Sequence, residues 1–339
     1  MLKKKFKMII LLLVILVVAI FAYFFVGRAK PAKVIEWGIN FSQKQAQALG
    51  LDWRETYLAI LDDLGAKKIK ISAHWDLLEK SSGVYDFSEL DWQLNQLADR
   101  QGKAILVIGM KTPRWPECHM PDWAKSLSKE NQQKVILQLL EKMVLRYRQH
   151  SAILAWQVEN EPLFPFGECP WRDKKFLGKE VALVKSLDPS RPIIVSDSGE
   201  TPLWWNIAGI AGVDMVGATM YRQVWFNSLH RQLSYPFPSV FYQRKAKLVE
   251  QIFGKKVICV ELQAEPWGEK LIQYISVDEQ IKIMSLEKFQ SNLDYAKSSG
   301  LDTFYLWGGE WWYFLKEKQG NDSFWQKAKT VFGQSSDLE

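Results

Sequence analysis

The sequence feature that most constrains the fold is a regular alternation of short apolar runs and helix-like stretches after residue 33. The runs are short, mainly apolar and without a regular polar–apolar alternation along the series, as expected for strands covered on both faces. They lie at residues 34–40, 68–72, 104–109, 153–158, 192–196, 213–218, 256–261 and 301–307. Eight such units over about 300 residues predict an α/β fold of the (β/α)8 TIM-barrel type.

The stretches between these runs carry helical periodicity. The segment 128–150 is the clearest, because its apolar residues recur three and four positions apart. Helices are also predicted at residues 52–64, 88–101, 174–186, 203–210, 239–253, 276–299 and 321–332. The alternative fold is an open doubly wound sheet, which usually has fewer units and a Gly-rich first turn that is absent from this sequence.

An uninterrupted apolar run, residues 8–26, precedes the alternation. A helix needs about 20 such residues to cross the hydrocarbon core of a bilayer. The run is longer than a typical signal-peptide core, and no clear small-x-small cleavage site follows it. We therefore expect a cytoplasmic stub, a transmembrane signal anchor and a linker within residues 1–33, and one catalytic domain at 34–339. A cleaved signal peptide is the alternative.

The charges that flank this run set its expected orientation. Four lysines precede the run and three basic residues follow it, so the positive-inside rule places the N-terminus in the cytoplasm and the domain outside. Seven of the 44 basic residues and none of the 38 acidic residues lie in residues 1–33, which leaves 37 basic against 38 acidic residues. The net charge of +6 therefore belongs to the anchor, and no nucleic-acid partner is expected.

The cysteines and histidines limit which disulfides and metal sites the sequence can form. Cys118 and Cys169 both lie in Pro-rich loops, where they could pair in an oxidising compartment or stay free. Cys259 lies in an apolar strand pattern and is interpreted as a small core residue. The four histidines show no metal-ligand spacing. No metal and no organic cofactor is implied.

Polar and aromatic residues gather where the predicted strands end. In a (β/α)8 barrel, functional groups lie at the C-terminal ends of the strands. The ends carry Asn40; His74 and Trp75; Lys111, Thr112, Pro113, Arg114 and Trp115; Asn160 and Glu161; Asp197; Tyr221 and Arg222; Glu261; and Trp307 with Glu310. Packing alone would not predict that concentration, so this end of the barrel is the expected active site.

Two carboxylates, Glu161 and Glu261, lie at the ends of the fourth and seventh predicted strands and are expected on opposite walls of one mouth. Retaining glycosidases use two carboxyl groups about 5–5.5 Å apart: one protonates the glycosidic oxygen and the other attacks the anomeric carbon. The pattern favours cleavage of β-glycosidic bonds by double displacement. The plainer interpretation is that each glutamate pairs with a basic residue, and Glu159 and Glu265 compete for the same two roles.

At these residues the chain resembles the clan of retaining (β/α)8 glycoside hydrolases that includes cellulases and β-galactosidases. Asn160, Glu161 and Pro162 match the clan's Asn-Glu-Pro motif, and Glu261 matches its nucleophile. The resemblance implies that Glu161 is the acid/base. It also implies that Asn160 binds the sugar hydroxyl next to the anomeric carbon.

The same resemblance implies further contacts. The residues implied to bind substrate, besides Asn160, are Tyr221, Trp307, Trp75, His74, Trp115 and His119. Tyr221 would also donate a hydrogen bond to the nucleophile. One position departs from the clan pattern, because Lys70 stands where an arginine commonly supports the nucleophile, and lysine is a point charge without the guanidinium fork.

These observations predict a membrane-anchored glycosidase that acts outside the cytoplasm on a β-linked oligo- or polysaccharide. Its expected partners are the carbohydrate substrate and the membrane, through residues 8–26, and no oligomer is implied. A catalytically weak or inactive glycan-binding barrel is one alternative, motivated by Lys70 and the anchor. A transglycosylase that uses the same carboxylate pair is the other.

Overall fold

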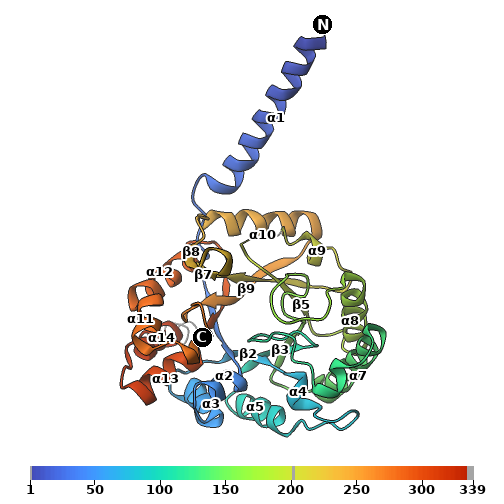
Figure 1. Ribbon diagram of the computed structural model, residues 1–339, viewed down its shortest axis with the longest axis vertical. Coiled ribbons are helices and arrows are strands. Elements are labelled where there is room, and N and C mark those ends of the chain that lie inside the picture. The colour runs from blue at the N-terminus through green and yellow to red at the C-terminus, as the bar shows by residue number, and fades with distance from the viewer. Residues whose placement is uncertain (1, 201–202, 334–339) are drawn as a thin grey trace.

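The computed structural model describes residues 2–200 and 203–333, and it contains a closed barrel of eight parallel strands (Figure 1). The barrel strands are Glu36–Phe41 (β1), Lys68–Ser72 (β2), Lys103–Ile108 (β3), Ile153–Val158 (β4), Ile193–Asp197 (β5), Met215–Met220 (β6), Lys256–Gln263 (β9) and Thr303–Trp307 (β10). They follow one another around the barrel in sequence order, and β10 pairs with β1 to close it. The predicted (β/α)8 barrel is confirmed. Residues 201–202 and 334–339 of the predicted domain lie outside the described residues.

A ring of helices surrounds the strands in Figure 1. The helices that cover the barrel are Trp53–Asp62 (α3), Ser88–Asp99 (α5), Lys129–Tyr147 (α7), Lys174–Leu187 (α8), Trp205–Ala208 (α9), Val240–Phe253 (α10), Leu286–Lys297 (α12) and Ser323–Gly333 (α14). Several begin at side chains that cap them. Asp52, Ser128 and Asp173 each accept backbone N–H bonds from the first turn of α3, α7 and α8. Such caps stabilise a helix by about 1 kcal/mol each.

The structure differs from the predicted elements in three places. Residues 276–299 were expected to form one helix, but they form Val277–Ile283 (α11) and α12, because Met284 is extended and Ser285 caps the second helix. An antiparallel hairpin, Gln223–Phe226 (β7) and Arg231–Ser234 (β8), follows β6 and was not predicted. Other elements were also missed: the helix Gly309–Gln319 (α13), the short helices Gln43–Ala48 (α2), Trp75–Leu78 (α4) and Asp122–Lys125 (α6), and the 3-10 turns Asn227–Leu229 and Ile272–Tyr274.

The core has an inner and an outer part. The outer part fills the space between strands and helices and includes the apolar stripe of α7. The inner part fills the barrel and consists of Ile105, Ala155, Ile194, Ile258, Val260 and Tyr305. Gly38 makes room for one of these side chains, because a Cβ at that position would lie 2.5 Å from Cε1 of Tyr305. The barrel interior is therefore filled by side chains, so a substrate can bind only at an end of the barrel.

The N-terminal helix Leu2–Phe25 (α1) projects from the rim of the barrel next to α10 (Figure 1). Its segment Lys4–Phe25 is the one candidate membrane span in the described chain, although a signal sequence near an N-terminus meets the same criterion. The end of α1 contacts α10: Phe25 lies 5.5 Å from Phe241 between ring centroids, and Arg244 bonds the carbonyls of Tyr23 and Val26.

Candidate active site

Glu161 and Glu261 reach the same end of the barrel from different strands. Glu161 lies just beyond β4, and Glu261 lies near the C-terminal end of β9, where it pairs in register with Thr219 of β6. The two carboxyl groups are close enough to interact, since the charge of Glu261 raises the pKa of Glu161. The predicted pair is therefore brought together at one mouth.

Both carboxylate oxygens of Glu261 are held. Lys70 Nζ donates to Oε1 at 2.8 Å, and the Tyr221 hydroxyl donates to Oε2 at 2.9 Å. The Lys70 side chain is fully buried and that of Glu261 is 4% exposed. An ion pair removed from water in this way has its charges compensated, and removal of either partner would leave the other uncompensated. Lys70 thus contacts Glu261 at the position where the clan commonly has arginine.

Glu161 has the opposite environment. Within the described chain it makes no ion pair, and Thr219 Oγ1 donates to its Oε1 at 3.0 Å. Its backbone N–H donates to Ser196 Oγ at 2.9 Å, which fixes the residue against β5. Burial, and then the charge of Glu261, raise the pKa of Glu161 well above its usual range. Both effects favour the protonated form of Glu161.

Backbone strain is concentrated at this end of the barrel. Of the six described residues other than glycine with positive φ, four lie here: Arg114, Glu117, Glu159 and Glu161. Such conformations cost about 1–3 kcal/mol each and cluster at functional sites. The loops after β3 and β4 therefore adopt conformations that cost folding free energy and that place their side chains at the mouth.

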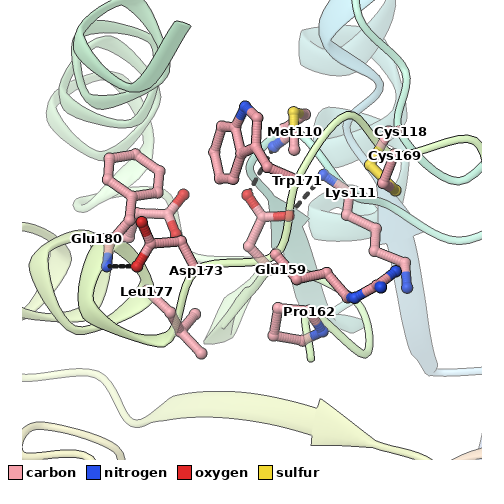
Figure 2. A pocket seen from close by; sticks show the side chains of 12 residues that line it. Met110, Lys111, Cys118, Glu159, Pro162, Cys169, Trp171, Asp173, Leu177 and Glu180 are labelled. Atoms are coloured by element: carbon pink, nitrogen blue, oxygen red, sulfur yellow. Dashed lines mark hydrogen bonds between the residues drawn. A yellow bond between two sulfur atoms is a disulfide. The ribbon is translucent and has the colours of Figure 1, made fainter. Parts of the chain in front are cut away.

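Glu159, one competitor for the catalytic roles, lines a small cavity behind the mouth (Figure 2). Its oxygens accept the backbone N–H groups of Met110 at 2.8 Å and Lys111 at 2.6 Å. Gly109 permits this contact, because its φ is +125° and a Cβ there would lie 2.3 Å from Glu159 Oε1. Glu159 therefore ties β4 to the loop after β3.

The same cavity contains Glu180 of α8, which shares a hydrogen bond with Glu159. Burial raises the pKa of both carboxyl groups, that of Glu180 most strongly. The hydrogen bond between them lowers the pKa of Glu159 and raises that of Glu180, and the two backbone N–H donors also favour charge on Glu159. The other competitor, Glu265, is bonded by Arg114 Nη2 at 3.2 Å and by Trp307 Nε1 at 2.8 Å.

Asn160 contacts Glu117, a carboxylate that we did not single out from the sequence. Its Oδ1 accepts from Gln157 Nε2 and Ser196 Oγ, and its Nδ2 donates to Glu117 Oε2 at 3.2 Å. Glu117 is 6% exposed, and burial is the main cause that raises its pKa to about 7. The sequence signal that could have identified Glu117 was its position next to Cys118, in a loop that already carried candidate site residues.

Cys118 and Cys169 form a disulfide that joins the loops after β3 and β4 (Figure 2). The sequence left this pairing open. Cys259 is buried and unpaired, as predicted for a small core residue. Among the residues that the structure describes, no three His, Cys, Asp or Glu side chains are grouped to hold a metal ion.

Aromatic side chains line one side of the mouth. Trp115 is 43% exposed, and its ring lies 5.9 Å from that of Phe166 between centroids. Phe166 contacts Trp267, and Trp267 contacts Tyr221 edge-on at 4.9 Å. Trp307 ends β10 as predicted, but it is 8% exposed and the Arg114 guanidinium lies 3.9 Å above its ring.

Three predicted sugar contacts are engaged with other groups of the protein. Trp75 was expected to line the mouth, but it is fully buried, and its Nε1 donates to Glu79 at 2.7 Å. His74 bonds Ser42 and Thr112 through its two ring nitrogens. His119 bonds Lys44 and the Arg114 carbonyl in the same way. Both ring nitrogens of each histidine are therefore engaged within the protein. The two histidines support the loop that carries Arg114.

Residues 93–311 match a family profile described as "Glycosyl hydrolases family 2, TIM barrel domain", and this range includes both Glu161 and Glu261. The chain belongs to this family. It resembles human β-glucuronidase, with 25% identity over 258 residues, which cover 67% of this chain and 33% of that protein. It also resembles β-galactosidase LacZ of Lactobacillus acidophilus, with 29% identity over 118 residues, or 29% of this chain and 17% of that protein. The chain thus spans a third or less of the length of these relatives.

Solved structures share the barrel of this family 2 domain. The β-galactosidase from Rahnella sp. R3 superposes with a TM-score of 0.60 at 12% identity, covering 92% of this chain and 58% of that one. Xylanase 10B from Thermotoga petrophila RKU-1 superposes with a TM-score of 0.55 at 15% identity, covering 81% and 82% of the two chains. At such identities the superpositions establish the fold. The predicted relationship to (β/α)8 glycoside hydrolases is confirmed by the family profile.

Proposed function

We propose that the chain is a retaining β-glycosidase in which Glu161 is the acid/base and Glu261 is the nucleophile. The observation that carries this proposal is the contrast between the two carboxyl groups. Glu261 is compensated by Lys70, whereas Glu161 has no ion pair in the described chain and a raised pKa. Neighbouring titratable groups with opposed environments are the usual mark of an acid and its partner base or nucleophile.

The reaction proceeds in two displacements. Glu261 attacks the anomeric carbon and forms a glycosyl ester, while the bond to the leaving oxygen breaks and the Glu161 proton passes to that oxygen. The Glu161 carboxylate then takes a proton from water, whose oxygen attacks the anomeric carbon and releases Glu261. Lys70 and Tyr221 hold the nucleophile in place through both steps.

The substrate we propose is a β-linked oligo- or polysaccharide. Asn160 would contact the hydroxyl beside the anomeric carbon, and Tyr221 would lie next to the reacting sugar. Trp115 offers an exposed ring for stacking, while one face of Trp307 is already covered. The similarity to β-glucuronidase and β-galactosidase supports a β-linkage.

We further propose that residues 1–33 anchor the catalytic domain, 34–339, outside the cytoplasm. The exposed apolar segment Lys4–Phe25 supports the anchor. The Cys118–Cys169 disulfide supports the location, because disulfides persist in oxidising compartments and are rare in the cytosol.

The catalytic assignment is tested with Glu161→Gln and Glu261→Gln on aryl β-glycosides, with Glu168→Gln, an exposed glutamate of the loop after β4, as the matched control. We expect each catalytic variant to lose at least about 10³-fold in kcat, because it removes a group that acts directly in the chemical step, and the control to keep its activity. Azide should restore turnover to a Glu261→Gly variant, and NMR should show a product of retained configuration. Full activity in either Gln variant would refute the assignment.

A further inference from the structure

Glu117 is a buried carboxylate of the mouth without a cation in contact. Its Oε2 accepts from Asn160 Nδ2 at 3.2 Å, and the residue is 6% exposed. Within the described residues its Oε1 has no hydrogen-bond donor, and Glu117 makes no ion pair. A buried carboxylate pairs with a cation or a set of donors, since the bare charge is costly to remove from water.

The cations nearby are engaged with other groups. Lys70 pairs with Glu261, and Arg114 pairs with Glu265 and Glu310. Lys111 donates through Nζ to the carbonyls of Glu161 at 2.9 Å and Phe164 at 3.3 Å. These arrangements leave the charge of Glu117 without a direct partner in the free enzyme.

The ionisation of Glu117 reflects this arrangement. Burial and the charge of Glu261 raise its pKa, whereas Lys111, Asn160 and Lys70 lower it, and the result is about 7. Glu117 is thus partly protonated at neutral pH. A cation that bound beside it would favour the ionised form.

The surrounding loops fix where the carboxylate points. Gly167, with φ of +91°, lies against the Glu117 side chain, and a Cβ there would approach the Glu117 Cβ to 2.5 Å. The next residue along the chain, Cys118, is bonded to Cys169. Glu117 therefore has little freedom to turn away from Asn160.

We propose that Glu117 selects β-glycosides that carry a free amino group on the carbon next to the anomeric carbon. This inference rests on the proposed function, because it uses the role given there to Asn160, which would lie beside that substituent. An ammonium group brings N–H donors for Glu117 Oε1 and the charge that the carboxylate lacks. A hydroxyl group brings no charge, and an acetamido group brings neither the charge nor the small size.

The test compares 4-nitrophenyl 2-amino-2-deoxy-β-glycosides with the matching 2-hydroxy and 2-acetamido compounds, in gluco and galacto configurations. We expect the wild type to give the highest kcat/KM on an amino compound. Glu117→Gln should lower that value about 10- to 100-fold, as expected for the loss of one charge-assisted hydrogen bond, and lower the 2-hydroxy value by a smaller factor, so that the ratio of the two values falls. Glu168→Gln serves as the control, and equal thermal melting temperatures verify folding.

A second measurement does not depend on turnover. Calorimetry of the Glu161→Gln variant should show tighter binding of a glucosamine oligomer than of a cello-oligomer, and additional Glu117→Gln should abolish the difference. A wild-type preference for 2-hydroxy or 2-acetamido compounds, or equal binding of the two oligomers, would overturn the inference and leave the proposed function standing. Cleavage of no β-glycoside at all would instead overturn the proposed function.

Discussion

The hydroxyl group of Thr219 tunes the proton affinity of Glu161. Its hydrogen bond to Glu161 favours the ionised carboxylate and so lowers a pKa that burial and Glu261 raise. Thr219 also accepts the N–H of Gly199 at 3.1 Å, which fixes the direction of the hydroxyl proton. The proton supply of the proposed acid therefore depends on a residue of β6 that itself transfers no proton.

We predict that Thr219→Val moves the alkaline limb of the kcat/KM profile to higher pH. Without the hydrogen bond the pKa of Glu161 rises further, so the acid form persists to higher pH. Thr219→Ser keeps the hydroxyl and should keep the wild-type limb. A pH–rate profile of the three proteins is the measurement, and a shift of the limb to lower pH in the valine variant would contradict the prediction.

A second residue-scale prediction concerns Lys70. Lys70→Met leaves Glu261 buried without its cation, and the loss of one partner of a buried ion pair costs about 3–5 kcal/mol. Lys68→Met, which breaks the more exposed pair with Glu36, should cost under about 1 kcal/mol. Urea unfolding of both variants makes the comparison. Equal losses of stability would show that the Lys70 pair has no special role.

At the scale of elements, the contact between Glu159 and Glu180 connects three parts of the barrel. Glu180 comes from α8, Glu159 follows β4, and the backbone N–H groups that Glu159 accepts belong to the loop after β3 (Figure 2). That loop also carries Glu117 and Trp115. A helix on the outside of the barrel thereby supports the loop that shapes the mouth.

We predict that Glu180→Gln is tolerated, because an amide N–H can replace the acid proton as the donor to Glu159. Glu180→Leu should lower the free energy of unfolding by about 1–3 kcal/mol, the cost of a buried acceptor that loses its donor. It should also lower kcat/KM more than the glutamine variant does. Thermal unfolding and steady-state kinetics provide the measurement, and indistinguishable variants would contradict it.

The barrel was predictable from the sequence because it depends on local, repeated signals: short, mainly apolar strands, the stripe of α7 and capping residues. The positions of Glu161 and Glu261 followed from the strand count. Residues whose role depends on a contact across the barrel were not predictable in this way. Trp75 turned inward at a strand end where an outward position was equally compatible with the sequence, and Glu117 gained its role only through Asn160 and Gly167.

The whole molecule consists of the barrel and one long helix that shares contacts with it. We predict that the full chain stays in the membrane pellet after alkaline carbonate extraction, because 22 residues of α1 form the exposed apolar segment. Intact-mass measurement on the extracted protein should include residues 1–33. A mature N-terminus near residues 28–33 would identify a cleaved signal peptide instead.

The contacts between α1 and α10 also limit how far the barrel can lie from the end of α1. Gln243 exchanges hydrogen bonds with the backbone of Lys30, and Arg244 holds the end of α1, so the connecting segment is attached at two points. In Figure 1, α1 leaves the rim of the barrel beside α10. If α1 crosses a bilayer, this double attachment keeps α10 and the barrel close to the membrane surface. The enzyme would then reach glycans that lie close to the membrane surface.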